Sequence, residues 1–212
     1  AGRGDFDAAI ESYKQAIKLK PDYLFSYNNM GNALKAKGDL DGALDSFKQA
    51  IKIKPDYFGA HYNMGNILRQ RGEFDAALDS YKQAIKIKPD YAEAYYNMGT
   101  AFADKGDLDA SIESYKQAIK FKPDYAEAYS NMGNALKDKD DLDASIEIYK
   151  QAIKIKPDYA EAHYNMGIAF ADKGDLDAAI ESYKQAIKIK PDYAEAYSNM
   201  GISLKDKGDL DA

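Results

Sequence analysis

The chain has 212 residues, of which 45% are hydrophobic and 12% aromatic, and its formal net charge is −6 at pH 7. This share of apolar residues is enough for a buried core, so the composition excludes an intrinsically disordered chain. No apolar run reaches the roughly 18 residues of a membrane-spanning helix. Cysteine is absent, which excludes disulfides and thiolate zinc sites. The negative charge opposes binding to the phosphates of nucleic acids.

One unit is copied about six times along the chain. Its period is 34 residues, the spacing of Pro21, Pro55, Pro89, Pro123, Pro157 and Pro191, and an Asn-Met-Gly triplet recurs with the same spacing. A period between about 20 and 50 residues is typical of a solenoid, in which each repeat contacts only its neighbours. We therefore expect one array over residues 1–212, with partial repeats at 1–23 and 194–212 and full repeats at 24–57, 58–91, 92–125, 126–159 and 160–193.

The opening partial repeat predicts one helix, near residues 6–19, and each full repeat predicts two. In the unit at 124–155, Tyr129, Met132 and Leu136 fall on one stripe of a 3.6-residue period, and a second stripe around Tyr149 follows. Proline then ends the second helix. The remaining helices are expected near 24–37, 41–53, 58–71, 75–87, 92–105, 109–121, 126–139, 143–155, 160–173, 177–189 and 194–207.

Acidic residues in the turns predict how the helices begin and end. Asp124 precedes a helix and Glu127 follows three residues later, the spacing of a capping box. Glu93, Glu161 and Glu195 occupy the same slot as Glu127, so we interpret this acidic column as capping partners. In the turn between the two helices of a repeat, Asp140 stands where other units have glycine, the residue that best tolerates a left-handed backbone.

The unit that starts at Ala92 carries an aromatic, a Met-Gly pair, a second aromatic, a turn glycine, a small residue, an aromatic, an alanine and a proline at fixed offsets. These are Tyr95, Met98, Gly99, Phe102, Gly106, Ser111, Tyr115, Ala118 and Pro123. The pattern resembles the tetratricopeptide repeat (TPR) family over essentially the whole chain. The resemblance implies an all-α fold, a right-handed α-solenoid superhelix of stacked helix-turn-helix repeats, whose first helices line a concave groove that binds extended peptides.

The Asn of each triplet is the central candidate for that groove. An ideal wheel places Asn131 about 200° from Tyr129, away from the core of its own repeat. A side-chain amide offers a donor and an acceptor to a peptide backbone. We therefore predict a peptide-binding site of Asn29, Asn63, Asn97, Asn131, Asn165 and Asn199 with Asn28, Tyr62, Tyr96, Tyr164, Asn32, Asn66, Asn134, Lys35, Arg69 and Lys137.

Two structural alternatives stay open for these residues. The Asn side chains can instead bond the neighbouring helix and fix the rotation between repeats, and the tyrosines can pack between adjacent helices. In chaperone-binding TPR proteins, Lys and Arg grip a C-terminal carboxylate. The corresponding slots here hold Asn28, Glu93 and Asn97, so no such clamp is expected.

The sequence predicts no enzyme, metal site or cofactor. The two histidines, His61 and His163, occupy slots that hold an aromatic in other repeats, so we expect them in the core. No phosphate-binding loop, nucleophile elbow or zinc motif is present.

The leading hypothesis is a protein-interaction scaffold that binds an extended peptide, with a cytoplasmic location favoured. The units are also similar to those of the array that precedes the catalytic domain of O-GlcNAc transferases, where an Asn ladder holds acceptor polypeptides. The chain begins in mid-repeat without Met, so a second hypothesis is the substrate-recruiting part of a larger enzyme.

A third hypothesis is a self-assembling or artificial array. The face around Tyr197 at one end and the face around Tyr13 at the other are halves of the same inter-repeat contact. They predict head-to-tail self-association, in which residues 1–5 or 208–212 move aside.

Overall fold

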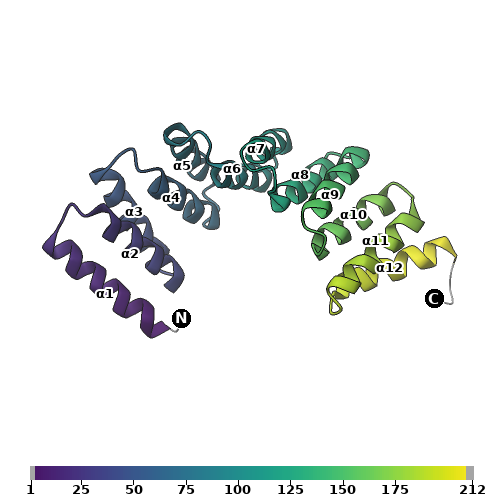
Figure 1. Cartoon of the computed structure of the whole chain (residues 1–212), viewed down its shortest axis with the longest axis horizontal. Helices are drawn as coiled ribbons and strands as arrows, with labels where there is room; N and C mark the ends of the chain where they lie inside the picture. The colour runs from purple at the N-terminus through teal and green to yellow at the C-terminus, as the bar shows by residue number, and fades with distance from the viewer. Residues whose placement is uncertain (1–2, 209–212) are drawn as a thin grey trace. The chain divides into compact units, whose positions relative to one another are not determined.

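The structure, a computed structural model, describes residues 3–208, and twelve α-helices and no strand occur in this range (Figure 1). The all-α prediction is confirmed, and every predicted helix is present with ends that differ from the prediction by at most three residues. The helices are α1 (Arg3–Leu19), α2 (Leu24–Lys37), α3 (Leu40–Ile53), α4 (Phe58–Gln70), α5 (Phe74–Ile87), α6 (Ala92–Asp104), α7 (Leu108–Phe121), α8 (Ala126–Asp138), α9 (Leu142–Ile155), α10 (Ala160–Asp172), α11 (Leu176–Ile189) and α12 (Ala194–Lys207).

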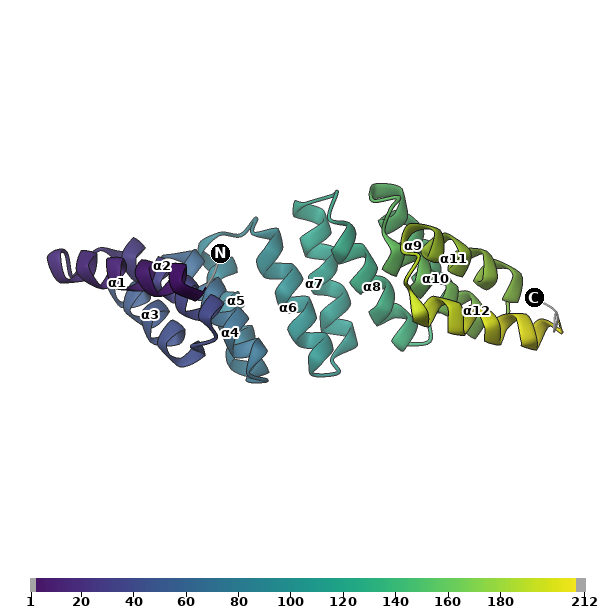
Figure 2. The ribbon, with the colours of Figure 1, turned by 90° about the horizontal axis from the view of Figure 1, so that it is seen from below.

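The helices belong to two compact units, Ala1–Lys105 with α1 to α6 and Gly106–Ala212 with α7 to α12. Within each unit every helix packs against the next one along the chain, as helix-turn-helix repeats do (Figures 1 and 2). The first helices of successive repeats also contact one another, α2 with α4 and α4 with α6 in the first unit, and α8 with α10 and α10 with α12 in the second. We call these two surfaces the first-helix faces.

A glycine on four of the first helices lets an aromatic ring of the second helix in the same repeat come unusually close. A Cβ atom added at Gly133 would lie 2.6 Å from Cε1 of Tyr149, whose side chain is fully buried. Any larger residue would therefore displace the ring. The same relationship joins Gly31 to Phe47, Gly65 to Tyr81 and Gly167 to Tyr183.

The predicted capping boxes are wrong. The residue that precedes α8 is Tyr125, and no side chain caps this helix, because the preceding Pro-Asp segment forms a turn and the helix begins after it. Glu127 instead lies 3.9 Å from Lys156. Side-chain caps occur on second helices, where the carboxylates of Asp39, Asp107, Asp141 and Asp175 accept from the backbone N–H three residues later.

Asp140 takes the left-handed conformation that glycine has in the other repeats, with φ 65°. An aspartate pays a modest energetic penalty for this conformation. The turn therefore keeps the same form despite the substitution.

Within residues 3–208, no helix combines the length and the apolar character that crossing a membrane requires. The predicted displacement of the chain ends at residues 1–2 and 209–212 falls outside the described residues.

Candidate functional site

The Asn column is bonded to the preceding repeat. The side-chain amide of Asn97 in α6 donates to the Tyr62 hydroxyl at 2.8 Å and to Oδ1 of Asn66 at 2.9 Å, both on α4. In the second unit, the Asn165 amide donates to Oδ1 of Asn134 at 3.1 Å. The corresponding bonds run from Asn63 to Asn28 and from Asn199 to Tyr164. We call the column Asn29, Asn63, Asn97, Asn131, Asn165 and Asn199 the Asn ladder.

A second asparagine on the first helix, Asn66 in α4 and Asn134 in α8, accepts the bond from the Asn ladder and one more. Oδ1 of Asn66 also accepts the hydroxyl of Tyr81 at 2.8 Å, and Oδ1 of Asn134 accepts the hydroxyl of Tyr149 at 2.6 Å. Burial raises the pKa of both tyrosines, so their hydroxyls remain protonated donors. Each acceptor therefore ties the second helix of its own repeat to the first helix of the next one.

Four of the ladder amides use their N–H groups within the protein, while their carbonyl oxygens accept no hydrogen bond from the described residues. Their N–H groups point into the inter-repeat network. Among the residues that the structure describes, none donates to Oδ1 of Asn63, Asn97, Asn165 or Asn199. These side chains are half-buried, so the carbonyl oxygens stay within reach of a ligand on the first-helix face.

Two tyrosines of the predicted site, Tyr62 and Tyr164, pack between helices, as the structural alternative expects. The ring centroid of Tyr62 lies 6.1 Å from that of Tyr81 and 4.9 Å from that of Tyr91. Tyr164 has the same surroundings, 6.0 Å from Tyr183 and 4.9 Å from Tyr193. Tyr62, Tyr96 and Tyr164 are all half-buried, so part of each ring also reaches the surface.

The remaining predicted residues differ in exposure and in charge compensation. Asn28 is buried, at 8% exposure, whereas Asn29 and Asn32 are exposed. Arg69 pairs with Asp104 of the next repeat at 2.9 Å. Lys137 pairs with its neighbour Asp138 at 2.8 Å, and Lys35 is half-buried. The positive charges of Arg69 and Lys137 are therefore partly neutralised within the protein.

A pocket of about 190 Å³ opens between α10 and α12 in the second unit. Ile168, Ala171 and Ile202 give it an apolar wall, and Tyr183 and Asn199 contribute polar atoms. Burial raises the pKa of Tyr183 to about 12, which the nearby Asn199 amide opposes. The pocket combines an apolar wall with a protonated hydroxyl. This arrangement suits an apolar side chain of a ligand together with a polar group of the adjacent ligand backbone.

A regular series of ion pairs was missed by the sequence analysis. Each joins the C-terminal end of a first helix to the start of the second helix in the preceding repeat, 30 residues earlier. The constant offset between the basic residue and the aspartate was the available signal. The pairs are Lys37–Asp7, Arg71–Asp41, Lys105–Asp75, Lys139–Asp109, Lys173–Asp143 and Lys207–Asp177.

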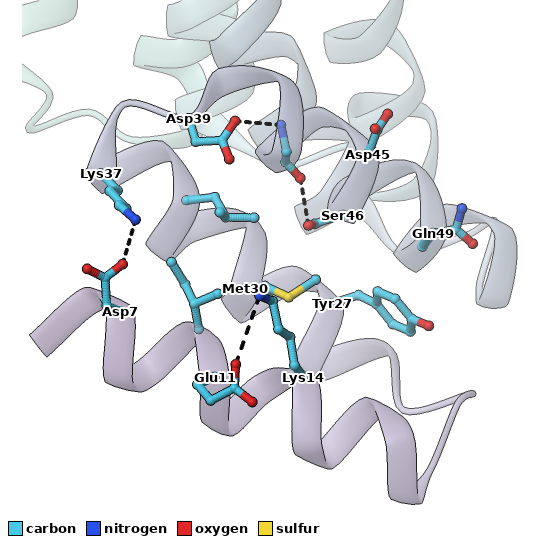
Figure 3. A pocket seen from close by; sticks show the side chains of 13 residues that line it. Asp7, Glu11, Lys14, Tyr27, Met30, Lys37, Asp39, Asp45, Ser46 and Gln49 are labelled. Carbon is cyan, nitrogen blue, oxygen red and sulfur yellow. Dashed lines mark hydrogen bonds and ion pairs between the residues drawn. The ribbon is translucent and has the colours of Figure 1, made fainter.

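Two larger clefts in the first unit lie between second helices. The cleft between α1 and α3 has a volume of about 590 Å³ and an apolar floor of Ile10, Met30 and Leu34 (Figure 3). Lys37 and Asp7, 2.5 Å apart, lie across its rim. The next cleft, of about 660 Å³, repeats this arrangement with Leu44, Met64 and Leu68 beneath Arg71 and Asp41. The rim charges are thus compensated by the protein itself.

The histidines lie where the sequence predicts. Nε2 of His61 is 2.9 Å from the carbonyl oxygen of Pro55, and Nε2 of His163 is 3.3 Å from that of Pro157. His61 is buried and His163 half-buried. Among residues 3–208, no three His, Asp or Glu side chains converge on a metal-binding position.

Comparisons with solved structures agree with this architecture. One similar structure is YrrB, described as a TPR protein with an unusual peptide-binding site, with 23% identity, a TM-score of 0.73, and coverage of 89% of this chain and 97% of that one. MamA is 30% identical, with a TM-score of 0.73 and coverage of 78% and 97%. A MamA fragment from Desulfovibrio magneticus RS-1 is 20% identical, with a TM-score of 0.74 and coverage of 81% and 97%.

A comparison with curated protein sequences finds no match. The TPR repeat family model, however, matches the chain six times, at residues 2–38, 31–68, 65–106, 99–140, 133–174 and 169–208. These overlapping matches cover nearly the whole sequence and coincide with the observed helix pairs. The chain therefore belongs to the TPR repeat family.

Proposed function

We propose that the chain is a non-catalytic protein-interaction scaffold that binds an extended segment of a partner protein along the first-helix face of either unit. The orientation of the Asn ladder carries this proposal. Its N–H groups are used within the protein, while the carbonyl oxygens of Asn63, Asn97, Asn165 and Asn199 receive no hydrogen bond from the described residues. Held in place by the network, these oxygens can accept backbone N–H groups without first losing conformational freedom.

An extended peptide can supply donors to such oxygens because its N–H groups alternate in direction, and those on one side recur about every 7 Å. Contacts to the backbone are insensitive to sequence, so affinity comes from the ladder and selectivity comes from its neighbours. Those neighbours differ between repeats, since the slot that holds Asn66 and Asn134 holds Ile168 and Ile202 in α10 and α12. The peptide-binding description of YrrB supports this class of ligand.

The partner is a protein and not a nucleic acid. The net charge of −6 repels phosphates, and the basic side chains at the ends of the first helices are paired with aspartates. Membranes with anionic lipids are disfavoured for the same reason.

The proposal is tested with a peptide selected from a random 12-residue library against the chain. Changing Asn97, Asn131 and Asn165 together to Ala should weaken its affinity at least about tenfold, because each amide-to-backbone bond contributes about 0.5–1.5 kcal/mol. Binding is measured by calorimetry well below the melting temperature of the variant.

A matched control changes three exposed or half-buried amides of second helices, Gln83, Gln117 and Gln151, to Ala. This variant should bind like the wild type. Unchanged affinity in the ladder variant, or an equal loss in both variants, would contradict the proposal.

Head-to-tail self-association is a second candidate function, favoured by one observation on α12. A Cβ atom at Gly201 would meet nothing within 4 Å, and Tyr197 is 48% exposed. In four other repeats this face covers an aromatic residue of the following second helix. A second copy that supplies α1 to this face would bury it, and the contact would generate open stacks.

Sedimentation velocity tests this second candidate. We expect the weight-average mass of the 212-residue chain to rise with concentration, and Tyr197→Glu to remove the rise. A mass that stays constant up to about millimolar concentration, where weak contacts become populated, would contradict it.

A further inference from the structure

A pocket lies between α10 and α12, where two residues of α10 differ from those at the same positions of α4. In the first unit the corresponding space lies between α4 and α6, and side chains of α4 occupy it. Asn66 accepts two hydrogen bonds there, and Arg69 spans to Asp104. In α10 the same two slots hold Ile168 and Ala171. The replacement of a carboxamide and a guanidinium by an aliphatic and a methyl group leaves about 190 Å³ open.

The substitution also removes the acceptor of a buried tyrosine. Tyr81 and Tyr149 donate to Asn66 and Asn134, but Ile168 has no atom that can accept from Tyr183. None of the residues that the structure describes accepts a hydrogen bond from the Tyr183 hydroxyl. Tyr183 is only 1% exposed and lines the pocket, so the pocket is the route by which an acceptor can reach this hydroxyl.

The rim of the pocket carries a carboxylate without a compensating cation. Asp172 is exposed and lines the pocket, and it forms no ion pair with any residue between 3 and 208. At the same position of α4, the first unit has Gln70, which carries no charge. The site therefore combines an aliphatic wall, an unused donor and an uncompensated negative charge.

We propose that this pocket receives one aliphatic side chain of an extended partner segment, with a Lys or Arg beside it in the partner sequence. The aliphatic group lies against Ile168, Ala171 and Ile202, a partner backbone carbonyl accepts from Tyr183, and the basic group pairs with Asp172. A volume of about 190 Å³ is roughly six times the share of one water in the liquid, which is room for one branched side chain. The inference rests on the proposed function, because it specifies which class of partner side chain binds to the second unit.

The pocket can be tested without a long peptide. N-acetyl-leucine N-methylamide is titrated into protein labelled at the Ile δ1 methyl groups, with the asparagine analogue as the control ligand. We expect saturable shifts at the Ile168 and Ile202 methyls with the leucine compound and at least about tenfold weaker binding of the asparagine compound, because burial of a leucine side chain is favourable. Shifts spread evenly over all isoleucines would overturn the proposal, whatever longer peptides do.

A second experiment fills the pocket with the residues that α4 already uses. The double variant Ile168→Asn with Ala171→Arg should fold, because Asp206 is available in the position of Asp104. The probe is a pair of capped hexapeptides, one with Lys-Leu and one with Lys-Asn at its centre. The wild type should prefer the Lys-Leu peptide by about tenfold or more, and the double variant should lose that preference. Ala36→Arg, on an exposed position of α2, adds the same charge away from the pocket and should retain it.

The outcomes separate this inference from the proposed function. If the double variant keeps the leucine preference while the ladder variant loses affinity, the pocket proposal fails and the peptide scaffold stands. If the methyl shifts appear as expected but peptide affinity does not depend on the Asn ladder, the pocket stands and the proposed function fails. Absence of both effects overturns both.

Discussion

Nδ2 of Asn97 lies 2.9 Å from Oδ1 of Asn66, and this bond joins the first helices of two successive repeats. The same amide also reaches Tyr62 at 2.8 Å. Asn97 is thus part of the contact between two successive repeats, and its own carbonyl oxygen accepts no hydrogen bond from the described residues.

The Asn97 contacts predict a loss of stability on truncation. Asn97→Ala should lower the free energy of unfolding by about 1–3 kcal/mol, since two hydrogen bonds at about 0.5–1.5 kcal/mol each are removed. Urea denaturation followed by circular dichroism measures the change. Asn29→Ala is the control, because Asn29 is exposed and accepts only one long bond, at 3.5 Å from Asn28. Equal effects of the two substitutions would show that the bonds of Asn97 contribute nothing.

Two glycines in equivalent positions should respond in opposite directions to the same substitution. Gly133→Ala places a Cβ atom 2.6 Å from Tyr149, so we expect a loss of about 1–3 kcal/mol from overpacking. Gly201→Ala meets nothing within 4 Å and should gain about 0.5–1 kcal/mol, because alanine is the better helix former. Thermal melting of both variants tests this. A loss at Gly201 like that at Gly133 would mean that its face is covered in solution.

The helix caps predict a contrast between two aspartates. Oδ1 of Asp107 accepts from the backbone N–H of Ala110 at 3.1 Å, so Asp107→Ala should cost about 0.5–2 kcal/mol. Asp124→Ala should change stability far less, because the residue before α8 is Tyr125 and no side chain caps that helix. Urea denaturation measures both changes. Equal losses in the free energy of unfolding would support the capping box that the sequence predicts.

The stability of the chain should depend on pH through His163. Burial lowers the pKa of this imidazole, so the unfolded chain binds the proton more strongly than the folded one. The contribution of the neutral, half-buried ring is therefore present above the unfolded pKa of about 6.5 and is lost as the pH falls below it. The variant His163→Tyr, which restores the residue found at Tyr95 and Tyr129, should show a smaller fall in melting temperature between about pH 8 and about pH 5. Parallel curves for the two proteins would contradict this assignment.

The sequence predicts the helices well because the same residue pattern recurs in each repeat. A stripe such as Tyr129, Met132 and Leu136 recurs in every unit, and proline or glycine marks each end. The first helices begin where the sequence predicts, but their capping does not follow the prediction, because an Asp-x-x-Glu spacing does not show that Pro123 and Asp124 already belong to a turn. Local pattern specifies the helix and its first residue, but not which side chain caps it.

The candidate site was less predictable, for a geometric reason. A helical wheel correctly turns Asn131 away from its own core, but it contains no information about the neighbouring helix. The partners of the ladder lie 31 and 35 residues earlier in the chain, and those of the ion pairs lie 30 residues earlier. Such offsets follow from the rotation between repeats, which is a property of packing. The pocket beside Ile168 could not be predicted for the same reason. It depends on the position of Tyr183, whose hydroxyl has no hydrogen-bond acceptor among the described residues where Ile168 replaces asparagine.

The central claim is that the carbonyl oxygens of the Asn ladder accept the backbone N–H groups of an extended peptide. Backbone N-methylation, one residue at a time, of the peptide selected from the 12-residue library tests it most directly, with affinities measured by calorimetry. The account predicts an alternating pattern, in which methylation at every second residue over the contacted segment weakens binding by about fivefold or more and methylation between them has little effect. Uniformly small effects at all positions would contradict it.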